Sequence, residues 1–440
     1  MKKLLLTIVA IALVVGLALS GCAPAAPTGQ EIIVGMCATK TGMFAGFGQG
    51  GSYGVQYAVE DINKQGGIDV GGTKMPIKLI VVDNESDPNK TATLTESLIL
   101  SDKAQFIVNA IDPPHIRSQA AIKCEQYGIP HITGNGPYES WMTLKGEAPK
   151  PWTHTWSISF AIATPAPEGD YRHGKPGFTM ADAYLKALSS LATTNMKVAA
   201  FATDEPDGRG WYMSITPLMK EKGFDVYKVD KEFGLVPLET TDFSTLIKEW
   251  KDAGCESFWS NSPGPVFAAL WKQAMAMGYK PKDAFATRAA VFYDDVISWG
   301  GNLAHGVSNE MFWNPGIKSS KGIGGTTPQS LADRYVKDTN LGYSQNLGFG
   351  YAAVQVLADA IKRAGSVDPE KVNAALKTTD LVTIYSRVAF DKDNYSRVPV
   401  AFGQWVSVDK PYKYENPVVL SVNDDLAATA EWEFPIKYKQ

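Results

Sequence analysis

The alternation of short β-branched runs with amphipathic helical segments constrains the fold of this chain more than any other feature. Strand candidates in the first part of the chain are 32–36, 77–82, 106–108 and 129–133. A helix is expected over 53–64, and another after Asp87, which can cap it while Pro88 takes the first turn. Strands that alternate with helices are typical of a parallel sheet with crossover connections.

The same pattern begins again after an irregular stretch rich in proline and tryptophan at 149–177. Strands are expected at 198–202, 226–229 and 257–260, and helices are expected to open at Thr179, Asp242 and Pro265. The last third adds a helix from about 347 to 364, ended by Gly365, a helix after Asp368, and hairpin-like strands around 388–390 and 401–408. The sequence therefore predicts an α/β protein with two similar lobes.

The first 22 residues have the features of an export signal that ends in a lipoprotein box. Lys2 and Lys3 precede an apolar run over 4–19, and Ser20-Gly21-Cys22 follows. We expect a signal peptide over 1–21, a lipid on Cys22 and a flexible tether over 22–30; an uncleaved anchor helix is the alternative. The mature chain would then lie outside the cytoplasm, attached to the cell membrane on its periplasmic or outer face.

Charge and cysteine content exclude several classes of protein. Removal of Lys2 and Lys3 with the leader changes the formal net charge from −4 to −6, which leaves no basic footprint for nucleic acid. Besides Cys22 the chain has only Cys37, Cys124 and Cys255, so neither a zinc site nor a disulfide framework is indicated. One disulfide plus one thiol, or three buried thiols, are both compatible with this number.

A series of short motifs from residue 32 to 408 resembles the substrate-binding proteins of ABC importers, in the family that binds leucine, isoleucine, valine and related ligands. These motifs are Ile33-Val34-Gly35, Ala58-Val59-Glu60-Asp61-Ile62-Asn63, Ser86-Asp87-Pro88, Asp207-Gly208-Arg209-Gly210, Thr241-Asp242-Phe243-Ser244, Gly350-Tyr351-Ala352-Ala353-Val354 and Phe390-Asp391. The resemblance implies a type I periplasmic binding protein, or Venus-flytrap, with two Rossmann-like lobes that close over a small ligand.

The resemblance also implies the arrangement of the lobes and the partners. Three hinge crossovers are expected near 156–160, 288–292 and 380–384. The N-terminal lobe would comprise 31–157 and 289–383, and the C-terminal lobe 158–288 and 384–440. A monomer that delivers its ligand to an ABC permease with its ATPase is expected.

A glycine-rich segment, Gly46-Phe47-Gly48-Gln49-Gly50-Gly51, matches the pattern G-x-G-x-x-G of dinucleotide-binding proteins. In that motif the first glycine directly follows the strand, whereas here about nine residues separate Met36 from Gly46. We therefore expect a loop over the cleft in which the glycines let the backbone approach a ligand and Phe47 forms an apolar wall. A plain glycine-rich surface loop is the alternative.

Catalytic patterns are scarce, so no enzyme, cofactor or metal is predicted. The histidines form no metal pair four residues apart, and neither a nucleophile elbow nor a phosphate-binding loop is present. The segment from Asp204 to Gly208 lacks the donor spacing of a calcium loop and is interpreted as a solvated turn. Asp294 and Asp295 are interpreted as a helix-start pair.

The expected ligand loops depart from those of amino-acid binders in this family. Where the resemblance places hydroxyl ligands for an α-carboxylate, the loops read Asn109-Ala110-Ile111-Asp112-Pro113-Pro114 and Thr133-Gly134-Asn135-Gly136-Pro137-Tyr138, with proline in place of each hydroxyl. By the same resemblance, Asp207 occupies the position of a tyrosine in the family. The position of the acid that pairs with the ligand ammonium is occupied by about Ala289, beside Arg288. An acid lost and an arginine gained argue against a zwitterionic amino acid.

Aromatic residues gather in the expected cleft segments. Together with Arg288, which can grip a carboxylate as a fork, they favour a hydrophobic or aromatic carboxylate; an amino acid or amide stays open. A surface salt bridge from Arg288 to Asp294 or Asp295 is the alternative role. The predicted ligand-binding residues are Phe47, Asn109, Asp112, Asn135, Tyr138, Trp156, Asp207, Trp259, Ser262, Arg288 and Phe292.

The sequence thus predicts an extracytoplasmic solute-binding component of an ABC importer. Two other classes share its features: a ligand-sensing protein that works with a receptor or kinase, and an extracytoplasmic enzyme. Fold alone does not separate them, because unrelated functions use the same architecture.

Overall fold

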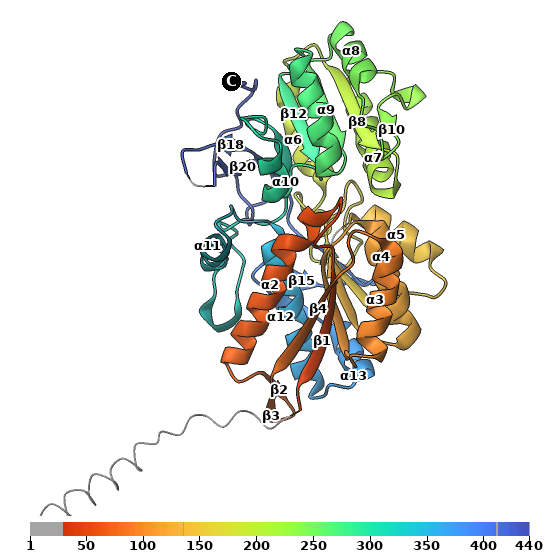
Figure 1. Cartoon of the computed structure of the whole chain (residues 1–440), viewed down its shortest axis with the longest axis vertical. Coiled ribbons are helices and arrows are strands. Elements are labelled where there is room, and N and C mark those ends of the chain that lie inside the picture. Colours follow the sequence, from red (N-terminus) through yellow and green to blue (C-terminus); the bar gives the residue numbers. More distant parts are fainter. Residues whose placement is uncertain (1–29, 135, 411, 440) are drawn as a thin grey trace, which may run out of the picture. The chain divides into compact units, whose positions relative to one another are not determined.

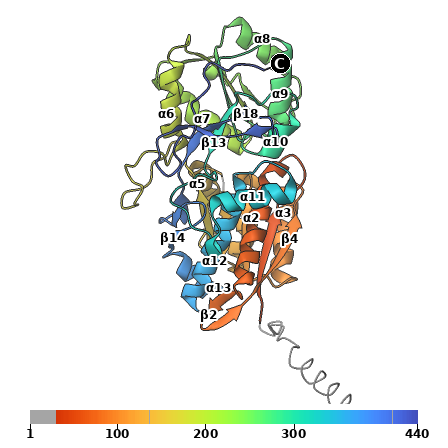
Figure 2. The same cartoon turned by 90° about the vertical axis from the view of Figure 1, so that its left-hand side faces the viewer.

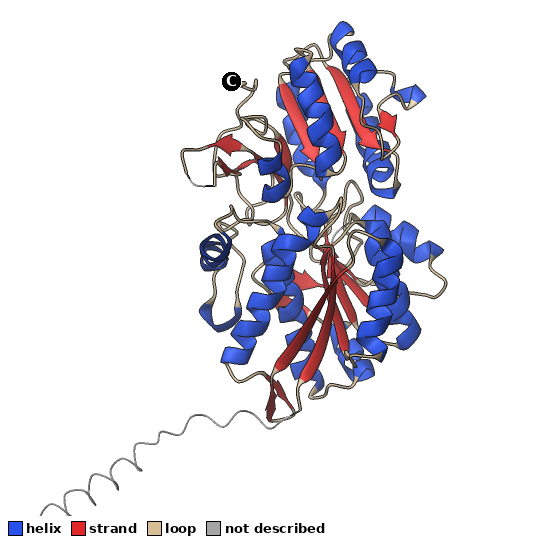
Figure 3. Cartoon of the chain, viewed as in Figure 1, coloured by secondary structure: helices blue, strands red, loops and turns tan. Residues whose placement is uncertain are grey.

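A parallel sheet and a mainly parallel sheet, each flanked by helices, organise the described part of the chain (Figures 1 and 3). The structure is a computed structural model that describes residues 30–134, 136–410 and 412–439. Residues 32–440 form one compact unit. The predicted leader over 1–21 and Cys22 lie outside the described residues. None of the described helices is long and apolar enough to cross a membrane.

The first sheet is entirely parallel and has the strand order β16-β7-β6-β5-β1-β4. In chain order its strands are β1 (Ile32–Ala38), β4 (Ile77–Asp83), β5 (Phe106–Ile111), β6 (His131–Gly134), β7 (Thr155–Ser159) and β16 (Tyr395–Arg397). Its helices are α2 (Ala45–Lys64), α3 (Pro88–Leu100), α4 (Pro114–Tyr127), α5 (Tyr138–Glu147), α12 (Asn346–Ala364) and α13 (Pro369–Leu376). Helices α2 and α12 cover one face, and α3 and α4 cover the other (Figure 1).

The second sheet has the order β10-β8-β11-β12-β13-β17-β20, with β9 beside β8. Its strands are β8 (Lys197–Thr203), β9 (Asp225–Val226), β10 (Leu235–Val236), β11 (Ser257–Asn261), β12 (Asp283–Thr287), β13 (Ser308–Met311), β17 (Ala401–Gln404) and β20 (Val418–Ser421). Strands β17 and β20 add antiparallel pairs to a parallel core. Figure 2 shows α6 (Met180–Leu191) and α7 (Pro206–Glu221) on one side, and α9 (Gly264–Ala276) and α10 (Tyr293–Ser298) on the other.

Smaller elements complete the chain. They include helices α8 (Ser244–Asp252) and α11 (Pro328–Thr339) and the short 3₁₀ turns η1 (Val229–Lys231) and η2 (Ile323–Gly325). Three two-stranded ribbons pair β2 (Ile68–Val70) with β3 (Thr73–Met75), β14 (Asp380–Val382) with β15 (Arg387–Ala389), and β18 (Val406–Ser407) with β19 (Tyr414–Glu415).

The helix starts predicted at Asp87 and Thr179 are confirmed, whereas those predicted at Asp242 and Pro265 are displaced by one or two residues, with α8 beginning at Ser244 and α9 at Gly264. The Asp87 carboxylate accepts hydrogen bonds from the amides of Asn89 and Lys90 at the start of α3. Thr179 and Asp182 form a reciprocal capping box at the start of α6, and Gly365 ends α12 in the left-handed conformation. The predicted fold class, two Rossmann-like α/β lobes joined by crossovers, is also confirmed.

The chain passes between the sheets three times, and two of the passages differ from the expected crossovers. The first follows β7, as expected near 156–160. The second follows β13 and the third lies between β16 and β17. Residues 308–311, expected in the N-terminal lobe, thus belong to the second sheet, and residues 395–397, expected in the C-terminal lobe, belong to the first. Strands of three or four residues carry too little periodicity to be assigned to a sheet from sequence.

The glycine-rich segment is the beginning of helix α2. Both predictions for it, a loop over the cleft and a plain surface loop, were therefore wrong. A Cβ on Gly48 would lie 2.1 Å from the carbonyl oxygen of Thr39. One on Gly54 would lie 2.2 Å from the carbonyl oxygen of Leu347 in α12, and one on Gly350 would lie 2.1 Å from that of Gly51. Gly54 and Gly350 allow α2 and α12 to pack backbone against backbone, and Gly48 allows α2 to approach Thr39. This close packing outweighs the low helix propensity of glycine.

Cys37, Cys124 and Cys255 are three buried free thiols, which decides between the two arrangements left open by the sequence. Burial raises the pKa of Cys37 and of Cys255 to about 12. These thiols are therefore protonated at neutral pH and contribute as small apolar side chains.

Asp283 opens β12 as a buried carboxylic acid, and we expect it to make stability depend on pH. Its side chain is 2% exposed, and burial raises its pKa to about 7. The unfolded chain titrates this group near 3.9, so the folded chain holds the additional proton between these values and loses stability as the pH rises through them. Relative to wild type, Asp283→Asn should gain about 2 to 3 kcal/mol of unfolding free energy between pH 5 and pH 8.

Urea denaturation of both proteins at the two pH values measures this difference. Asp102→Asn, at an exposed turn, is the matched control and should show no such change. An equal effect of Asp283→Asn at pH 5 and pH 8 would contradict the prediction.

Candidate functional site in the cleft between the sheets

A small cavity lies where the carboxyl ends of strands from both sheets meet. Asp112 follows β5, Phe160 follows β7, and Arg288 follows β12. The complete lining consists of Phe47, Asp112, Pro114, Gly136, Pro137, Phe160, Asp207, Trp211, Arg288, Val291, Phe292 and Glu310. Ligands of open α/β sheets bind at such strand ends. The volume of the cavity is about 20 Å³, which is room for about one water molecule.

Arg288 is the centre of the polar wall that the second sheet contributes. Its guanidinium lies 2.7 Å from a carboxylate oxygen of Glu205 and 3.0 Å from one of Asp207. The same group donates to the Thr203 hydroxyl at 2.8 Å, and the backbone amide of Arg288 donates to the Glu310 carboxylate at 2.7 and 2.8 Å. Arg288 is 3% exposed and has a φ of 64°. A buried arginine held in this conformation is fixed by its partners.

These contacts correct the alternative role of Arg288. The sequence suggested a surface salt bridge to Asp294 or Asp295, whereas the observed pairs are buried and involve Glu205 and Asp207. Glu205 and Asp207 also open α7, with the Glu205 carboxylate bonded to the amides of Asp207 and Gly208. The segment expected as a solvated turn is therefore a helix cap that holds an arginine. Asp294 and Asp295 lie in the first turn of α10, as expected.

Asp112 is the charged residue of the wall contributed by the first sheet. One of its carboxylate oxygens accepts a hydrogen bond of 2.5 Å from the Thr39 hydroxyl. Behind this wall lies Arg117, which is 1% exposed and whose guanidinium nitrogens bond to no described group. Arg117 lies directly against Gly136, which lines the cavity, since a Cβ on Gly136 would lie 2.6 Å from the guanidinium.

Burial and neighbouring charges shift the pKa of the acids on both walls. Burial raises the pKa of Asp112 to about 7 and that of Glu310 to about 8. It also raises the pKa of Asp207 to about 6, although Arg288 acts in the opposite direction. The Arg288 guanidinium overcomes burial at Glu205 and lowers the pKa of that carboxyl. Acids with such raised pKa values are typical of functional clefts.

Aromatic rings from both parts of the chain fill most of the remaining surface. The rings of Phe47 and Phe292 are 4.6 Å apart between centroids, and those of Phe160 and Trp211 are 5.9 Å apart. Phe47 lies in α2 and Phe160 follows β7, both beside the first sheet. Trp211 lies in α7 and Phe292 precedes α10, both beside the second sheet, so each pair connects the two sides of the cavity. Apolar walls with a few polar groups are the usual lining of a small-molecule site.

The structure brings together part of the predicted site. Phe47, Asp112, Asp207, Arg288 and Phe292 all line the cavity. Their contact with a ligand stays a prediction. Asn135 lies outside the described residues.

Five other predicted residues do not line this cavity. The Asn109 side chain accepts from the amide of Cys37 and faces His131 within the sheet. The indole of Trp156 donates to Asn373. Trp259 and Ser262 are buried at β11, where the indole nitrogen and the hydroxyl bond to no described group. The fifth is Tyr138.

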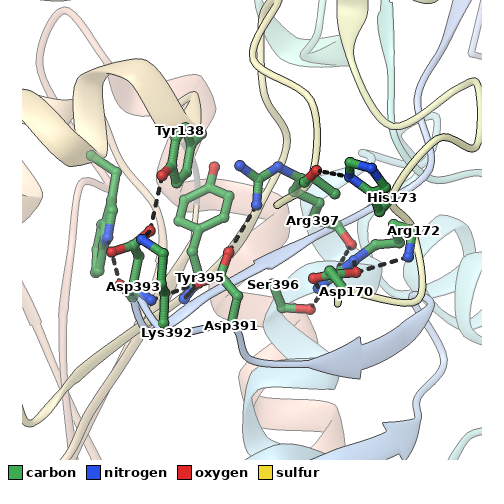
Figure 4. A network of polar contacts seen from close by, with 12 residues as sticks. Tyr138, Asp170, Arg172, His173, Asp391, Lys392, Asp393, Tyr395, Ser396 and Arg397 are labelled. Carbon is green, nitrogen blue, oxygen red and sulfur yellow. Dashed lines mark hydrogen bonds and ion pairs between the residues drawn. The ribbon is translucent and has the colours of Figure 1, made fainter. Parts of the chain in front are cut away.

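Tyr138 belongs to a polar network beside the third passage between the sheets (Figure 4). Its hydroxyl donates to Asp393 at 2.9 Å, and the Arg397 guanidinium lies 4.1 Å from its ring centroid. Arg397 also pairs with Asp391, and Arg172 donates to the carbonyl oxygen of Arg397. The network ties the end of the first sheet to the segment that follows β7.

Sequence reasoning missed Glu310 and Arg117. Glu310 lies in the four-residue strand β13, which has no sequence signal of its own. Arg117 follows the predicted loop by one turn of α4, so the helical period could have placed it near the cleft. Among the described residues no group of histidine, cysteine, aspartate and glutamate side chains could hold a metal ion.

The family model described as periplasmic binding protein matches residues 31–409. The chain belongs to this family. A Leu/Ile/Val-binding protein homolog 1 of Brucella abortus (strain 2308) is 24% identical over 94% of this chain and 99% of its own length. Members of the family are extracytoplasmic proteins that bind small molecules and work with ABC transporter components.

Solved structures support the same fold. The leucine-binding protein LivK from Thermotoga maritima has a TM-score of 0.69 at 18% identity and covers 89% of this chain and 99% of its own. A solute-binding protein of an ABC transporter from Rhodopseudomonas palustris BisB5, in complex with 3,4-dihydroxybenzoic acid, has a TM-score of 0.67 at 16% identity and covers 91% and 99%. These relatives are solute-binding proteins, and at such identities they establish the fold.

Proposed function

We propose that the cavity between the two sheets captures a small organic solute and that the chain delivers this solute to an ABC permease and its ATPase. The observation that carries the proposal is the cavity itself, which residues from both sheets line at their strand ends. Membership in a family of solute-binding proteins supports it. We further propose that the chain catalyses no reaction.

Ligand entry requires the walls to separate. A volume of about 20 Å³ cannot hold an organic molecule, so the cavity must widen before one can enter. The passages after β7, after β13 and between β16 and β17 are the covalent links across which two lobes can rotate. We propose that these segments are the hinge.

The N-terminal segment would hold the protein near its permease. We propose that 1–21 are removed on export, that Cys22 carries the lipid and that 22–30 form the tether. A tethered monomer reaches a high effective concentration at the permease without any additional contact.

Ligand candidates come from the cavity and from the relatives. Aromatic walls favour hydrophobic solutes, and the classes expected from the sequence are hydrophobic or aromatic carboxylates, amino acids and amides. The relatives' names refer to branched-chain amino acids and to 3,4-dihydroxybenzoic acid. Phe47, Asp112, Asp207, Arg288 and Phe292 are the proposed ligand-binding residues.

Thermal unfolding of the purified protein with a library of these classes, together with amines, tests the proposal. A ligand that binds only the folded chain stabilises it by about 2.7 kcal/mol at about 100 times its Kd, so a hit should raise the melting temperature. If no compound of any class raises it, solute capture is contradicted.

A matched pair of variants locates the binding site. Phe47→Leu changes a ring that lines the cavity, whereas Phe44→Leu changes a buried neighbour whose ring centroid lies 6.3 Å away and that does not line it. We expect Phe47→Leu to weaken a hit and Phe44→Leu to preserve it. Equal affinities of the two variants would place the site elsewhere.

A further inference from the structure

Carboxyl groups outnumber basic groups on the walls of the cavity. Asp112, Asp207 and Glu310 line it. Glu205 does not line it but pairs with Arg288, as Asp207 does. Among the described lining residues Arg288 is the basic one. The four acids supply four carboxyl groups. Arg288, together with Arg117 beside Gly136, supplies two guanidinium groups, so two of the four carboxyl groups have no positive partner of their own.

The guanidinium of Arg288 is already engaged. Its two terminal nitrogens are held by Asp207 at 3.0 Å and by Glu205 at 2.7 Å, with Thr203 at 2.8 Å. A ligand carboxylate would have to displace these acids and leave them buried without a partner, which is costly. The buried Nε bonds to no described group, so Arg288 retains one donor but does not offer an anion a fork of two free nitrogens.

Several amides at the helix N-termini beside the cavity are bonded within the protein as well. In α7 the amides of Asp207 and Gly208 donate to Glu205, each at 3.0 Å. The Tyr138 amide at the start of α5 donates to the carbonyl oxygen of Phe160 at 2.9 Å, and the Ile116 amide in α4 donates to that of Pro113 at 3.0 Å. Each of these helices begins beside a proline, which removes one more donor. These bonds and prolines leave fewer backbone donors at the cavity for an anion.

The aromatic rings complete a surface suited to a cation. Phe47 and Phe292 meet on one side, and Phe160 and Trp211 meet on the other. Ring faces attract organic cations, most strongly where water is excluded. Burial raises the pKa of Asp112 to about 7 and of Glu310 to about 8, the direction expected of buried carboxyl groups that lack a full counter-charge.

We propose that the ligand of this cavity is an organic cation, a hydrophobic or aromatic body that carries an ammonium or amidinium group and needs no carboxylate. The nitrogen donates to Asp112 and Glu310, and the body lies among the rings. This inference rests on the proposed capture of a solute in the cavity, and it departs from the carboxylate that the sequence favoured.

A matched series of compounds tests it on the wild-type protein. The series is 2-phenylethylamine, 2-phenylethanol, phenylalanine and 3-phenylpropanoate, and the measurement is affinity by calorimetry at pH 7.5. We expect the amine to bind most tightly. 3-Phenylpropanoate should bind about tenfold more weakly or worse, because the wall carboxyl groups repel its negative charge. Tighter binding of 3-phenylpropanoate or phenylalanine than of the amine would overturn the inference. That result is expected if protonated wall carboxyls donate hydrogen bonds to a ligand carboxylate.

Two variants connect the charge to the named wall. Asp112→Asn should weaken the amine about tenfold or more, whereas Asp283→Asn, a buried acid of the second sheet outside the cavity, should not. Equal affinities of the two variants for the amine would also overturn the inference. If acids or amino acids bind while the amine does not, the organic-cation inference fails and solute capture stands; if nothing in the wider library binds, solute capture itself fails.

Discussion

Arg288→Met is expected to lower the unfolding free energy by about 3 to 5 kcal/mol, because it leaves two buried acids without their counter-charge. Glu205 and Asp207 stay in place at the start of α7, and the methionine fills most of the volume of the arginine without its donors. Unpaired buried carboxyls have raised pKa values, so the folded variant holds additional protons and becomes less stable as the pH rises. The deficit relative to wild type should therefore be larger at pH 8 than at pH 5.

Urea denaturation at both pH values measures the effect, and Arg209→Met is the matched control. Arg209 lies in α7, the helix that begins at Glu205 and Asp207, and pairs with Asp204 and Glu232, but its side chain is 42% exposed. Exposed ion pairs contribute little, so this variant should lose no more than about 1 kcal/mol. Similar losses in the two variants would show that the buried cluster is not a special source of stability.

Gly54→Ala is expected to lower the unfolding free energy by about 3 kcal/mol or more, because its methyl group would be 2.2 Å from the carbonyl oxygen of Leu347. A backbone atom cannot rotate away as the end of a flexible side chain can. Helices α2 and α12 must separate, and the apolar residues between them lose their contacts.

Gly146→Ala is the control for a helical glycine. It lies in α5, and nothing lies within 4 Å of the position of its Cβ. Alanine is a better helix former, so this variant should be neutral or more stable by up to about 1 kcal/mol. Thermal or urea unfolding of both variants distinguishes the two outcomes. A small effect of Gly54→Ala would mean that the helices repack with little strain.

Much of the architecture could be predicted from local chemistry. Asp87 and Thr179 start helices because their side chains satisfy amide groups that any helix leaves unpaired, and Gly365 ends one because it adopts a left-handed conformation without strain. Helix α2 shows where such reasoning fails. Its glycines have low helix propensity, and only the approach of α12 and Thr39 explains why no larger residue could replace them.

The site was predicted less completely than the fold. Comparison with the ligand loops of the family directed attention to Asp112, Asp207 and Arg288, and all three line the cavity. The charge balance is not local, since it depends on which acids meet Arg288. Glu205 and Glu310 come from different segments, and their contact with Arg288 changes it from a free cation to the centre of a buried cluster.

By itself the sequence determined the α/β class, the two-lobe organisation and most helix starts, because periodicity, capping and turn residues act over a few positions. The tertiary structure decided the rest. It placed β13 and β16 in their sheets, made the glycine-rich segment a packed helix, and surrounded Arg288 with acids. Each of these depends on residues far apart in the chain, and their Coulomb and packing energies exist only once folding has brought them together.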